Sequence, residues 1–393
     1  MHLCFFDTEE SWQQMLPLSY TRPVAEMRVG ILKIHEKWSR ILGSSSVSFQ
    51  TQGYLSALFE QPSQRSLFIK GGLLPAKSLI DAIDKLKEDQ VLVCEDQLIA
   101  GYFKAGATIE IGSKKPITIS EVVEVAYPWD IFRLNGTEIR KDFELLTKDR
   151  PTQPIKDGHT RTYGQDIFVE EGATIKAAIL NAENGPIYVG RGAEIQEGSL
   201  IRGPFALCDH SVVNMGAKIK GDSTIGPYSK VGGEVSNSVI QGYSNKGHEG
   251  FLGNSVIGEW CNLGADTNNS NLKNNYANVK MWDFRSQRFK DTGLQFCGLI
   301  MGDHSKCGIN TMFNTGTTVG VSANIFGEGF PRTIIPSFAW GGASGFSTYQ
   351  TRKAFETAEL VMQRRKKDLS EKEKAMLSHI FEITSENRVW EKK

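Results

Sequence analysis

Aliphatic residues recur at every sixth position through the middle of the chain. The first series is unbroken and consists of Val189, Ile195, Ile201, Leu207, Val213, Ile219, Ile225 and Val231. A second series consists of Met301, Cys307, Phe313, Val319 and Ile325. Residues four positions further on are nearly all small, as Ala193 and Ser199 illustrate. A period of six matches neither the alternation of an ordinary strand nor the 3.6-residue turn of an α-helix.

This period is typical of a left-handed parallel β-helix built from hexapeptide repeats, in which three short strands form one triangular coil. The aliphatic side chains would stack inside the prism and the small residues would fit its corners. The pattern predicts such a solenoid from about residue 167 to residue 336. It breaks at 231–257 and at 268–301, where we expect loops, which often form the binding face of a solenoid.

The flanking segments lack the six-residue period. Short apolar runs at 3–6, 67–69 and 91–94 predict strands, and 76–87 predicts a helix, so residues 1–150 read as a small α/β domain. The polar stretch Arg150-Pro-Thr-Gln-Pro154 is a plausible linker. The β-helix domain would then occupy residues 151–346.

Residues 347–393 are predicted to form a helical cap on the solenoid. Both Ser347-Thr-Tyr-Gln350 and Ser370-Glu-Lys-Glu373 match the capping-box pattern. They predict helices over 354–367 and 372–387, which would cover the unpaired strands at the solenoid end. The basic run 364–367 is interpreted as a solvated helix end, with a phosphate site as the alternative.

Composition favours small molecules as partners. The chain has 45 basic and 45 acidic residues, so its bulk charge attracts neither nucleic acid nor an anionic membrane. No apolar run approaches the roughly 20 residues that span a bilayer, and the N-terminal residues lack the features of a signal peptide. The six cysteines form no C-x-x-C pair, which favours a reduced, cytoplasmic protein.

His248 is the strongest candidate for chemistry. It lies between Gly247 and Gly250 in the first break of the pattern. An imidazole there accepts a proton near neutral pH, as acyl transfer from a thioester to an amine requires. The alternative is a loop histidine that is bonded to a backbone carbonyl.

The residues around His248 resemble the acetyltransferase half of the bifunctional GlmU family. The matching stretch is Lys246-Gly-His248, then Gly253-Asn254, Ile257-Gly and Asn262-Leu-Gly264. Family members acetylate glucosamine 1-phosphate from acetyl-CoA and couple the product to UTP. The resemblance implies roles for His248 as general base, Asn262 and Glu234 in binding the sugar, and Arg202 in gripping its phosphate. It also implies a homotrimer with active sites between neighbouring coils.

Two positions depart from the family pattern. Ser236 replaces a lysine and Phe251 replaces a tyrosine, which leaves the specificity for an amino sugar open. A zinc site, as in hexapeptide carbonic anhydrases, is a weaker interpretation. It would need about three protein ligands, and His210, His248 and His304 are dispersed along the chain.

The stretch Leu16-Pro-Leu-Ser-Tyr-Thr-Arg22-Pro23 resembles a signature of sugar-1-phosphate nucleotidyltransferases. The resemblance implies that Arg22, Arg28 and Lys37 offset phosphate charge, with Mg²⁺ as cofactor. Asp7 and Asp96 are the candidate magnesium ligands. Structural ion pairs for the cations and a helix N-cap for Asp7 are the alternatives. The Gly-rich phosphate loop of these enzymes is absent, and Val24 replaces their lysine.

The sequence is consistent with three functional hypotheses. The first is a bifunctional GlmU-type enzyme that acetylates an amino-sugar 1-phosphate and transfers a nucleotidyl group. The second retains nucleotidyl transfer alone, with the β-helix as a trimerisation scaffold. The third is a non-catalytic sugar-nucleotide sensor, which the absence of the Gly-rich loop supports.

Overall fold

The computed structural model describes residues 1–391 and divides the chain into two compact units. The N-terminal unit comprises residues 1–27 and 32–127, and the solenoid unit comprises residues 28–31 and 128 onward. The division precedes the helix α4 (Pro128–Thr147), whereas the sequence suggested a boundary after it, at residue 150.

The N-terminal unit contains a six-stranded sheet with strand order β2-β1-β3-β6-β5-β7. Strand β1 runs parallel to both β2 and β3, and β6 is antiparallel to β3. The predicted strands and helix are confirmed. The elements are β1 (His2–Phe6), β2 (Ser46–Gln50), β3 (Ser66–Lys70), β4 (Leu73–Leu74), β5 (Gln90–Cys94), β6 (Gln97–Phe103), β7 (Lys115–Thr118), β8 (Val123–Glu124), α1 (Glu9–Gln14), α2 (Ile34–Ile41) and α3 (Lys77–Asp84).

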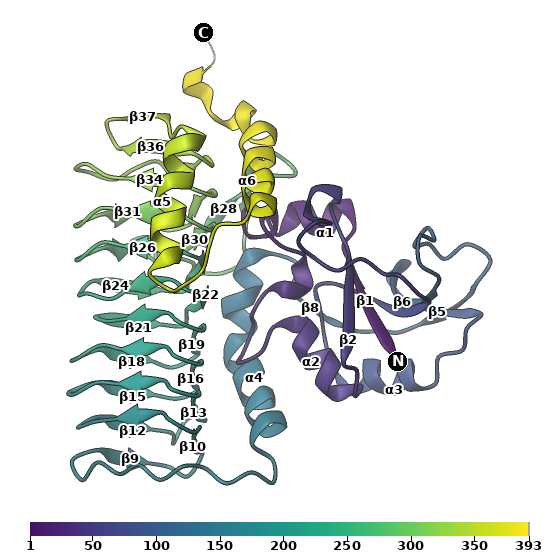
Figure 1. Cartoon of the computed structure of the whole chain (residues 1–393), viewed down its shortest axis with the longest axis horizontal. Helices are drawn as coiled ribbons and strands as arrows, with labels where there is room; N and C mark the ends of the chain where they lie inside the picture. Colours follow the sequence, from purple (N-terminus) through teal and green to yellow (C-terminus); the bar gives the residue numbers. More distant parts are fainter. Residues whose placement is uncertain (392–393) are drawn as a thin grey trace. The chain divides into compact units, whose positions relative to one another are not determined.

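The solenoid unit confirms the predicted stack of coils, with three parallel sheets as its faces (Figure 1). The first face consists of β10 (Ile167–Val169), β13 (Ile187–Val189), β16 (Phe205–Leu207), β19 (Ser223–Ile225), β22 (Val239–Gly242), β25 (Val256–Glu259), β30 (Leu299–Met301), β33 (Thr317–Val319) and β35 (Ile334–Ile335). The second face consists of β11 (Thr174–Ile175), β14 (Glu194–Ile195), β17 (Val212–Val213), β20 (Lys230–Val231), β23 (Asn245–Lys246), β26 (Asn262–Leu263), β31 (Lys306–Cys307), β34 (Asn324–Ile325), β36 (Ala339–Gly342) and the antiparallel β37 (Gly345–Thr348). The third face consists of β9 (Arg161–Tyr163), β12 (Ile179–Asn181), β15 (Leu200–Arg202), β18 (Lys218–Lys220), β21 (Glu234–Ser236) and β24 (Phe251–Gly253).

Aliphatic side chains fill the prism, as the six-residue period predicted. On the second face the inward positions pair in register from Ile175 through Ile195 and Val213 to Val231. These four side chains are at most 7% exposed. Removal of such surface from water contributes about 25 cal/mol per Å², so each coil is stabilised by its neighbours.

The first break in the pattern is not a loop, contrary to expectation. Ile225 pairs with Ile240, and Ile240 pairs with Ile257. These coils therefore contain 15 and 17 residues, whereas Leu207 and Ile225 are 18 residues apart. The corners of these coils are shorter while the strands still stack. The six-residue spacing of aliphatic positions is therefore lost, although the coil continues.

The second break is a true insertion between two stacked strands. Ile257 pairs with Met301, and the chain between them first continues the coil through β26 and then leaves the prism after Asn269. Strand β27 (Asn268–Asn269) pairs with β32 (Met312–Phe313) and continues the coil beside β24. The insertion that follows contains a hairpin of β28 (Lys280–Asp283) and β29 (Arg288–Asp291).

Helix α4 packs on the first face and was not predicted. Its residues Asn135 and Gly136 look like a turn signal, but both face the solenoid. The Nδ2 atom of Asn135 donates to the carbonyl of Asp222 at 2.9 Å. A Cβ on Gly136 would lie 1.9 Å from Oδ1 of Asp222, so only glycine allows this approach.

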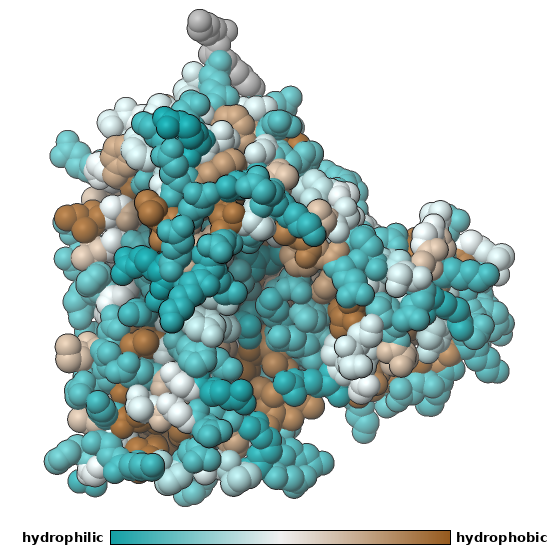
Figure 2. Space-filling view, viewed as in Figure 1, coloured by the Kyte–Doolittle hydropathy of each residue, from teal (hydrophilic) through white to brown (hydrophobic). Residues whose placement is uncertain are grey.

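The predicted C-terminal helices are confirmed as α5 (Thr351–Gln363) and α6 (Glu371–Ile383). Ser370 forms the expected capping box with Glu373. The prediction at Ser347 is wrong, because this residue lies in β37, whose pairing with β36 competes with a helix start. Mainly hydrophilic side chains cover α5 (Figure 2). Within residues 1–391 no helix is long and apolar enough to cross a membrane.

Candidate functional site

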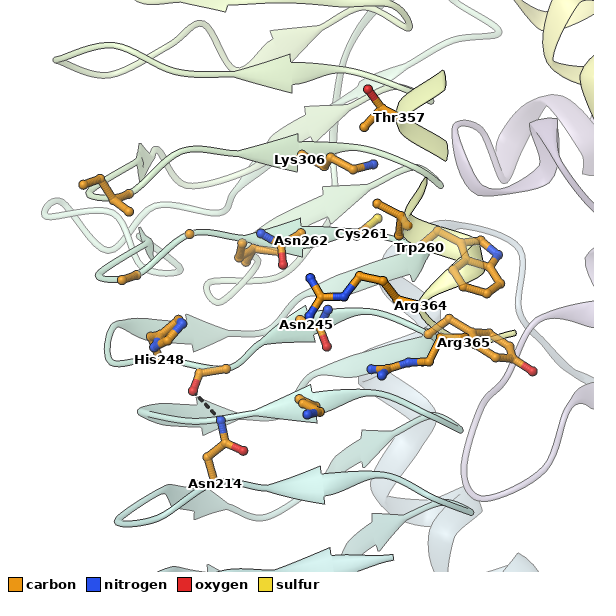
Figure 3. A pocket seen from close by; sticks show the side chains of 18 residues that line it. Asn214, Asn245, His248, Trp260, Cys261, Asn262, Lys306, Thr357, Arg364 and Arg365 are labelled. Carbon is orange, nitrogen blue, oxygen red and sulfur yellow. Dashed lines mark hydrogen bonds between the residues drawn. The ribbon is translucent and has the colours of Figure 1, made fainter. Parts of the chain in front are cut away.

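A cavity of about 700 Å³ lies between the second face of the solenoid and the C-terminal end of α5. Its floor is formed by the outward side chains Asn245, Asn262 and Lys306, which occupy successive strands in one register. His248 borders the cavity at one corner of the coil, and Trp260 borders it at another (Figure 3). Two residues predicted from the sequence, His248 and Asn262, therefore share one site.

Four cationic side chains line this cavity, namely Lys230, Lys306, Arg364 and Arg365. None of the described residues that line it is acidic. Such a concentration of uncompensated positive charge suits a ligand with several negative charges, and guanidinium groups suit phosphate in particular.

Arg364 and Arg365 belong to the basic run 364–367, for which the sequence favoured a solvated helix end over a phosphate site. Nη2 of Arg365 donates to the carbonyl of Tyr228 at 3.1 Å. The ammonium of Lys367 lies 5.4 Å from the ring centre of Tyr243. These contacts hold the end of α5 against the solenoid, and Arg364 extends from there toward Asn245 (Figure 3).

Tyr228 and Tyr243 belong to a continuous ladder of aromatic rings at one corner of the prism. His210, Tyr228, Tyr243, Trp260 and His304 stack face to face in successive coils, with ring centres 4.3–6.3 Å apart. All five residues have positive φ. The ladder gives α5 a firm support beside the cavity.

Lys306 is the cation on the cavity floor, and its pKa is shifted by burial. Its Nζ donates to the carbonyl of His304 at 2.8 Å. Burial lowers the pKa of Lys306 to about 8, and the nearby Cys261 acts in the opposite direction. The side chain therefore carries its charge at neutral pH and loses it as the pH rises above 8.

The corner that carries His248 is held through its backbone. Asn214 Nδ2 donates to the carbonyl of Gly247 at 2.6 Å, and Lys246 Nζ donates to that of His248 at 2.5 Å. The imidazole is exposed and makes no hydrogen bond to residues 1–391. The side chain is therefore accessible from the cavity that it lines.

A second, smaller cavity of about 380 Å³ adjoins His248 on the side of the preceding coils. It lies over a corner of only two residues, Gly232 and Gly233, where the preceding coil has four residues between β17 and β18. A Cβ on Gly232 would lie 2.4 Å from the carbonyl oxygen of Gly247. The shortened coil therefore requires glycine here and leaves space next to the histidine.

The third face carries the predicted sugar-binding residues Glu234 and Arg202. Glu234 pairs with Phe251, on the strand that follows the His248 corner. Arg202 lies two strands away from β21, or roughly 10 Å at the usual strand spacing. Lys220 lies between them and forms an ion pair with Glu234 at 2.7 Å. Lys220 therefore lies closer to Glu234 than Arg202 does. The sequence motifs did not indicate Lys220.

The N-terminal unit has its own cavity of about 510 Å³. It is lined by Phe6, the last residue of β1, and by Thr8, by Lys70 at the end of β3, and by the acidic residues Glu9, Glu10 and Glu124. The chain crosses from β2 on one side of β1 to β3 on the other. Ligands of open α/β sheets bind at such a switch point, beyond the carboxyl ends of the strands. Lys70 Nζ lies 2.8 Å from Glu124 Oε1 in this cavity.

The cations predicted from the nucleotidyltransferase resemblance are buried. Arg22 and Arg28 are each 6% exposed and Lys37 is 1% exposed. None of the three lines the cavity at α5, the cavity over Gly232 and Gly233 or the cavity of the N-terminal unit, and Arg28 belongs to the segment 28–31 of the solenoid unit. Gln241 bonds the backbone of Arg28 through both amide atoms, at 2.7 and 3.1 Å.

The two predicted magnesium ligands do not form one site. Asp7 accepts hydrogen bonds from Thr51 Oγ1 at 2.7 Å and from the amide of Val24 at 3.2 Å. Burial raises its pKa to about 6. Asp96 lies in the turn after β5, three strand spacings from β1, or roughly 14 Å. Within residues 1–391 no three His, Cys, Asp or Glu side chains are arranged to hold a metal ion.

Comparison with known proteins supports the resemblance inferred from the motifs. Residues 3–151 match the family model of sugar nucleotidyl transferases. The chain is 37% identical over 87 residues to the bifunctional protein GlmU of Methanocaldococcus jannaschii, which covers 22% of this chain and 21% of that protein. It is 24% identical over 329 residues to GlmU of Bartonella quintana, which covers 75% of this chain and 62% of that protein.

A third relative is the bifunctional sugar-1-phosphate nucleotidylyltransferase/acetyltransferase of Sulfurisphaera tokodaii. It is 28% identical over 160 residues, which cover 40% of this chain and 37% of that protein. In all three comparisons the chain spans less than two thirds of the relative's length. The chain is thus similar, at low identity, to the GlmU-type bifunctional proteins, and its residues 3–151 match the sugar nucleotidyl transferase family.

Proposed function

We propose that the solenoid unit transfers an acetyl group from acetyl-CoA to the amino group of an amino-sugar 1-phosphate. The observation that carries this proposal is the cavity in which His248 and Asn262 meet four cations and no acid. The cations suit the several phosphates of CoA, and the exposed imidazole suits a general base. The similarity to GlmU-type proteins supports the same chemistry.

In the proposed reaction His248 accepts the proton that the attacking amine loses. The amine nitrogen forms a bond to the thioester carbonyl, the carbon–sulfur bond breaks, and CoA leaves as the thiol with that proton. Glu234, Lys220 and Arg202 on the third face would hold the sugar and its phosphate. The losses of polar contacts at Ser236 and Phe251 leave room for a sugar other than glucosamine.

Replacement of His248 by alanine tests the assignment of the base. We expect kcat for acetyl transfer from acetyl-CoA to glucosamine 1-phosphate to fall by about 10²- to 10⁴-fold. The KM for acetyl-CoA should change little. The exposed His159 gives a matched control, since His159→Ala should keep full activity. Full activity of His248→Ala would exclude this histidine as the base.

Lys306→Met tests the cationic cavity as the acetyl-CoA site. The loss of one charge-assisted hydrogen bond should raise the KM for acetyl-CoA by about 10- to 100-fold. Because burial lowers the pKa of Lys306 to about 8, the wild-type KM should rise as the pH passes 8, and this rise should flatten in the variant. The exposed Lys176 provides the control variant Lys176→Met. An unchanged KM across pH 6–9 would place CoA elsewhere.

We also propose that three copies of the chain associate through the third face. Helix α4 packs on the first face and α5 borders the cavity on the second. The neighbouring strands of the third face expose Tyr163, Ile179 and Leu200, each 40–48% exposed. Exposed apolar side chains on neighbouring strands are typical of an association surface. Leu200 lies on β15, two strands from Glu234 on β21.

Leu200→Glu should therefore yield monomers in sedimentation velocity and lose acetyl transfer, because a buried unpaired carboxylate opposes association. Leu360, which is 66% exposed on α5, gives the control variant Leu360→Glu, which should remain trimeric. A monomeric wild-type protein would contradict this proposal, and a trimeric Leu200→Glu variant would place the interface elsewhere.

A second activity, nucleotidyl transfer to a sugar 1-phosphate, is proposed for the N-terminal unit. The family match over residues 3–151 and the cavity at the switch point of the sheet support it. Lys70 is the cation that lines this cavity. Asp7 and Asp96 do not fit a shared Mg²⁺ site, so no step is assigned to the metal.

Pyrophosphate release in the presence of UTP, dTTP or GTP and a hexose 1-phosphate measures this activity. We expect Lys70→Met to lower the rate by about 10²-fold, since it removes a positive charge beside the transferring phosphate. The exposed Lys104 provides the control Lys104→Met. No pyrophosphate release from the wild-type protein with any of these pairs would favour a non-catalytic sensor.

A further inference from the structure

A lysine occupies the interior of the solenoid, directly beneath the corner that carries His248. The outward residue of β23 is Asn245, so Lys246 takes the inward position in register with Val231. Inward residues of the neighbouring coils on this face are Val213, Leu263 and Cys307. Lys246 is 2% exposed. It is the single charged side chain in a column of aliphatic and thiol groups from Ile175 to Ile325.

The ammonium of Lys246 bonds the backbone of the next corner. Nζ donates to the carbonyl of His248 at 2.5 Å and to that of Glu249 at 3.2 Å. Asn214 Nδ2 donates to the preceding carbonyl, that of Gly247, at 2.6 Å (Figure 3). Three successive carbonyls therefore accept side-chain donors, two of them from inside the prism.

Packing alone does not account for a lysine here. A buried ammonium in an apolar column opposes folding, and burial lowers the pKa of Lys246 to about 8. The charges of Glu249 and Asp266 and the thiol of Cys307 favour the ammonium, and Lys218 opposes it. An aliphatic residue, as at Val231 and Leu263, fills the same position in adjacent coils without this cost.

We propose that Lys246 is a positioning residue that fixes the peptide groups of His248 and Glu249 so that the imidazole faces the cavity. The proposal rests on the role of His248 proposed above. Lys246 touches no substrate in this arrangement, and it acts through hydrogen bonds to the backbone of the residue that does. The interior of the coil thereby sets the orientation of a group on its surface.

Lys246→Met tests this role, because methionine keeps an unbranched chain and removes the ammonium. We expect an unfolding temperature at least equal to that of the wild type, since replacement of a buried charge by an apolar group is neutral or stabilising. The kcat for acetyl transfer should fall by about 10²-fold, as expected for a displaced catalytic group, with the KM for acetyl-CoA unchanged. Hydrogen exchange should quicken in segments 247–251 and 264–267, since the amide of Asp266 bonds the carbonyl of Glu249 at 3.0 Å.

Val213→Met, at another inward position of the same column, is the matched control and should leave exchange in segment 247–251 unchanged. Wild-type exchange and wild-type kcat in Lys246→Met would overturn the proposal. If the wild-type protein shows no acetyl transfer, the proposed function fails, and the exchange measurement alone still decides the role of Lys246. Lys246→Leu is the second variant, and failure of both variants to fold would overturn the proposal by showing that the lysine supports the coil itself.

Discussion

Stacking of one inward side chain on the next is the constraint on which the solenoid depends. Its strands have two to four residues each, too few to be stable alone, and each coil buries its apolar residues only against its neighbours. The same stacking brings every outward residue into register with its counterparts above and below. Asn245, Asn262 and Lys306 lie in one row for this reason. The core thus determines the spacing of the groups that form the cavity.

The sequence was sufficient for the features that stacking determines. The inward column, the coil architecture, the cap at Ser370 and the shared site of His248 and Asn262 all follow from residue period or motif. It was insufficient where distant segments meet. Arg364 and Arg365 look like a solvated helix end because nothing local indicates that α5 folds back over the second face. Helix α4 contains a turn-like Asn135-Gly136 pair whose reason is Asp222, 86 residues beyond Gly136.

The N-terminal unit differs because no repeat constrains it. Its signature residues Arg22 and Lys37 are buried, so their types alone did not distinguish a phosphate site from a structural role. The sequence did not indicate Lys70 as a site residue, because it is the last residue of a strand whose other residues are typical of a buried core. Its significance comes from the order of strands in the sheet, which depends on pairings between segments far apart in the sequence.

The short corner at Gly232 and Gly233 has an evolutionary consequence. A prism of stacked coils is convex everywhere, and concavity usually requires an added loop. Here a hollow beside His248 arises where a corner has two residues instead of four. Deletions at corners leave the inward columns unbroken, so they alter the shape of a site without weakening its support. Such a fold can gain a pocket when residues are deleted from a corner. We therefore expect relatives that differ in coil length near the site to differ in substrate specificity.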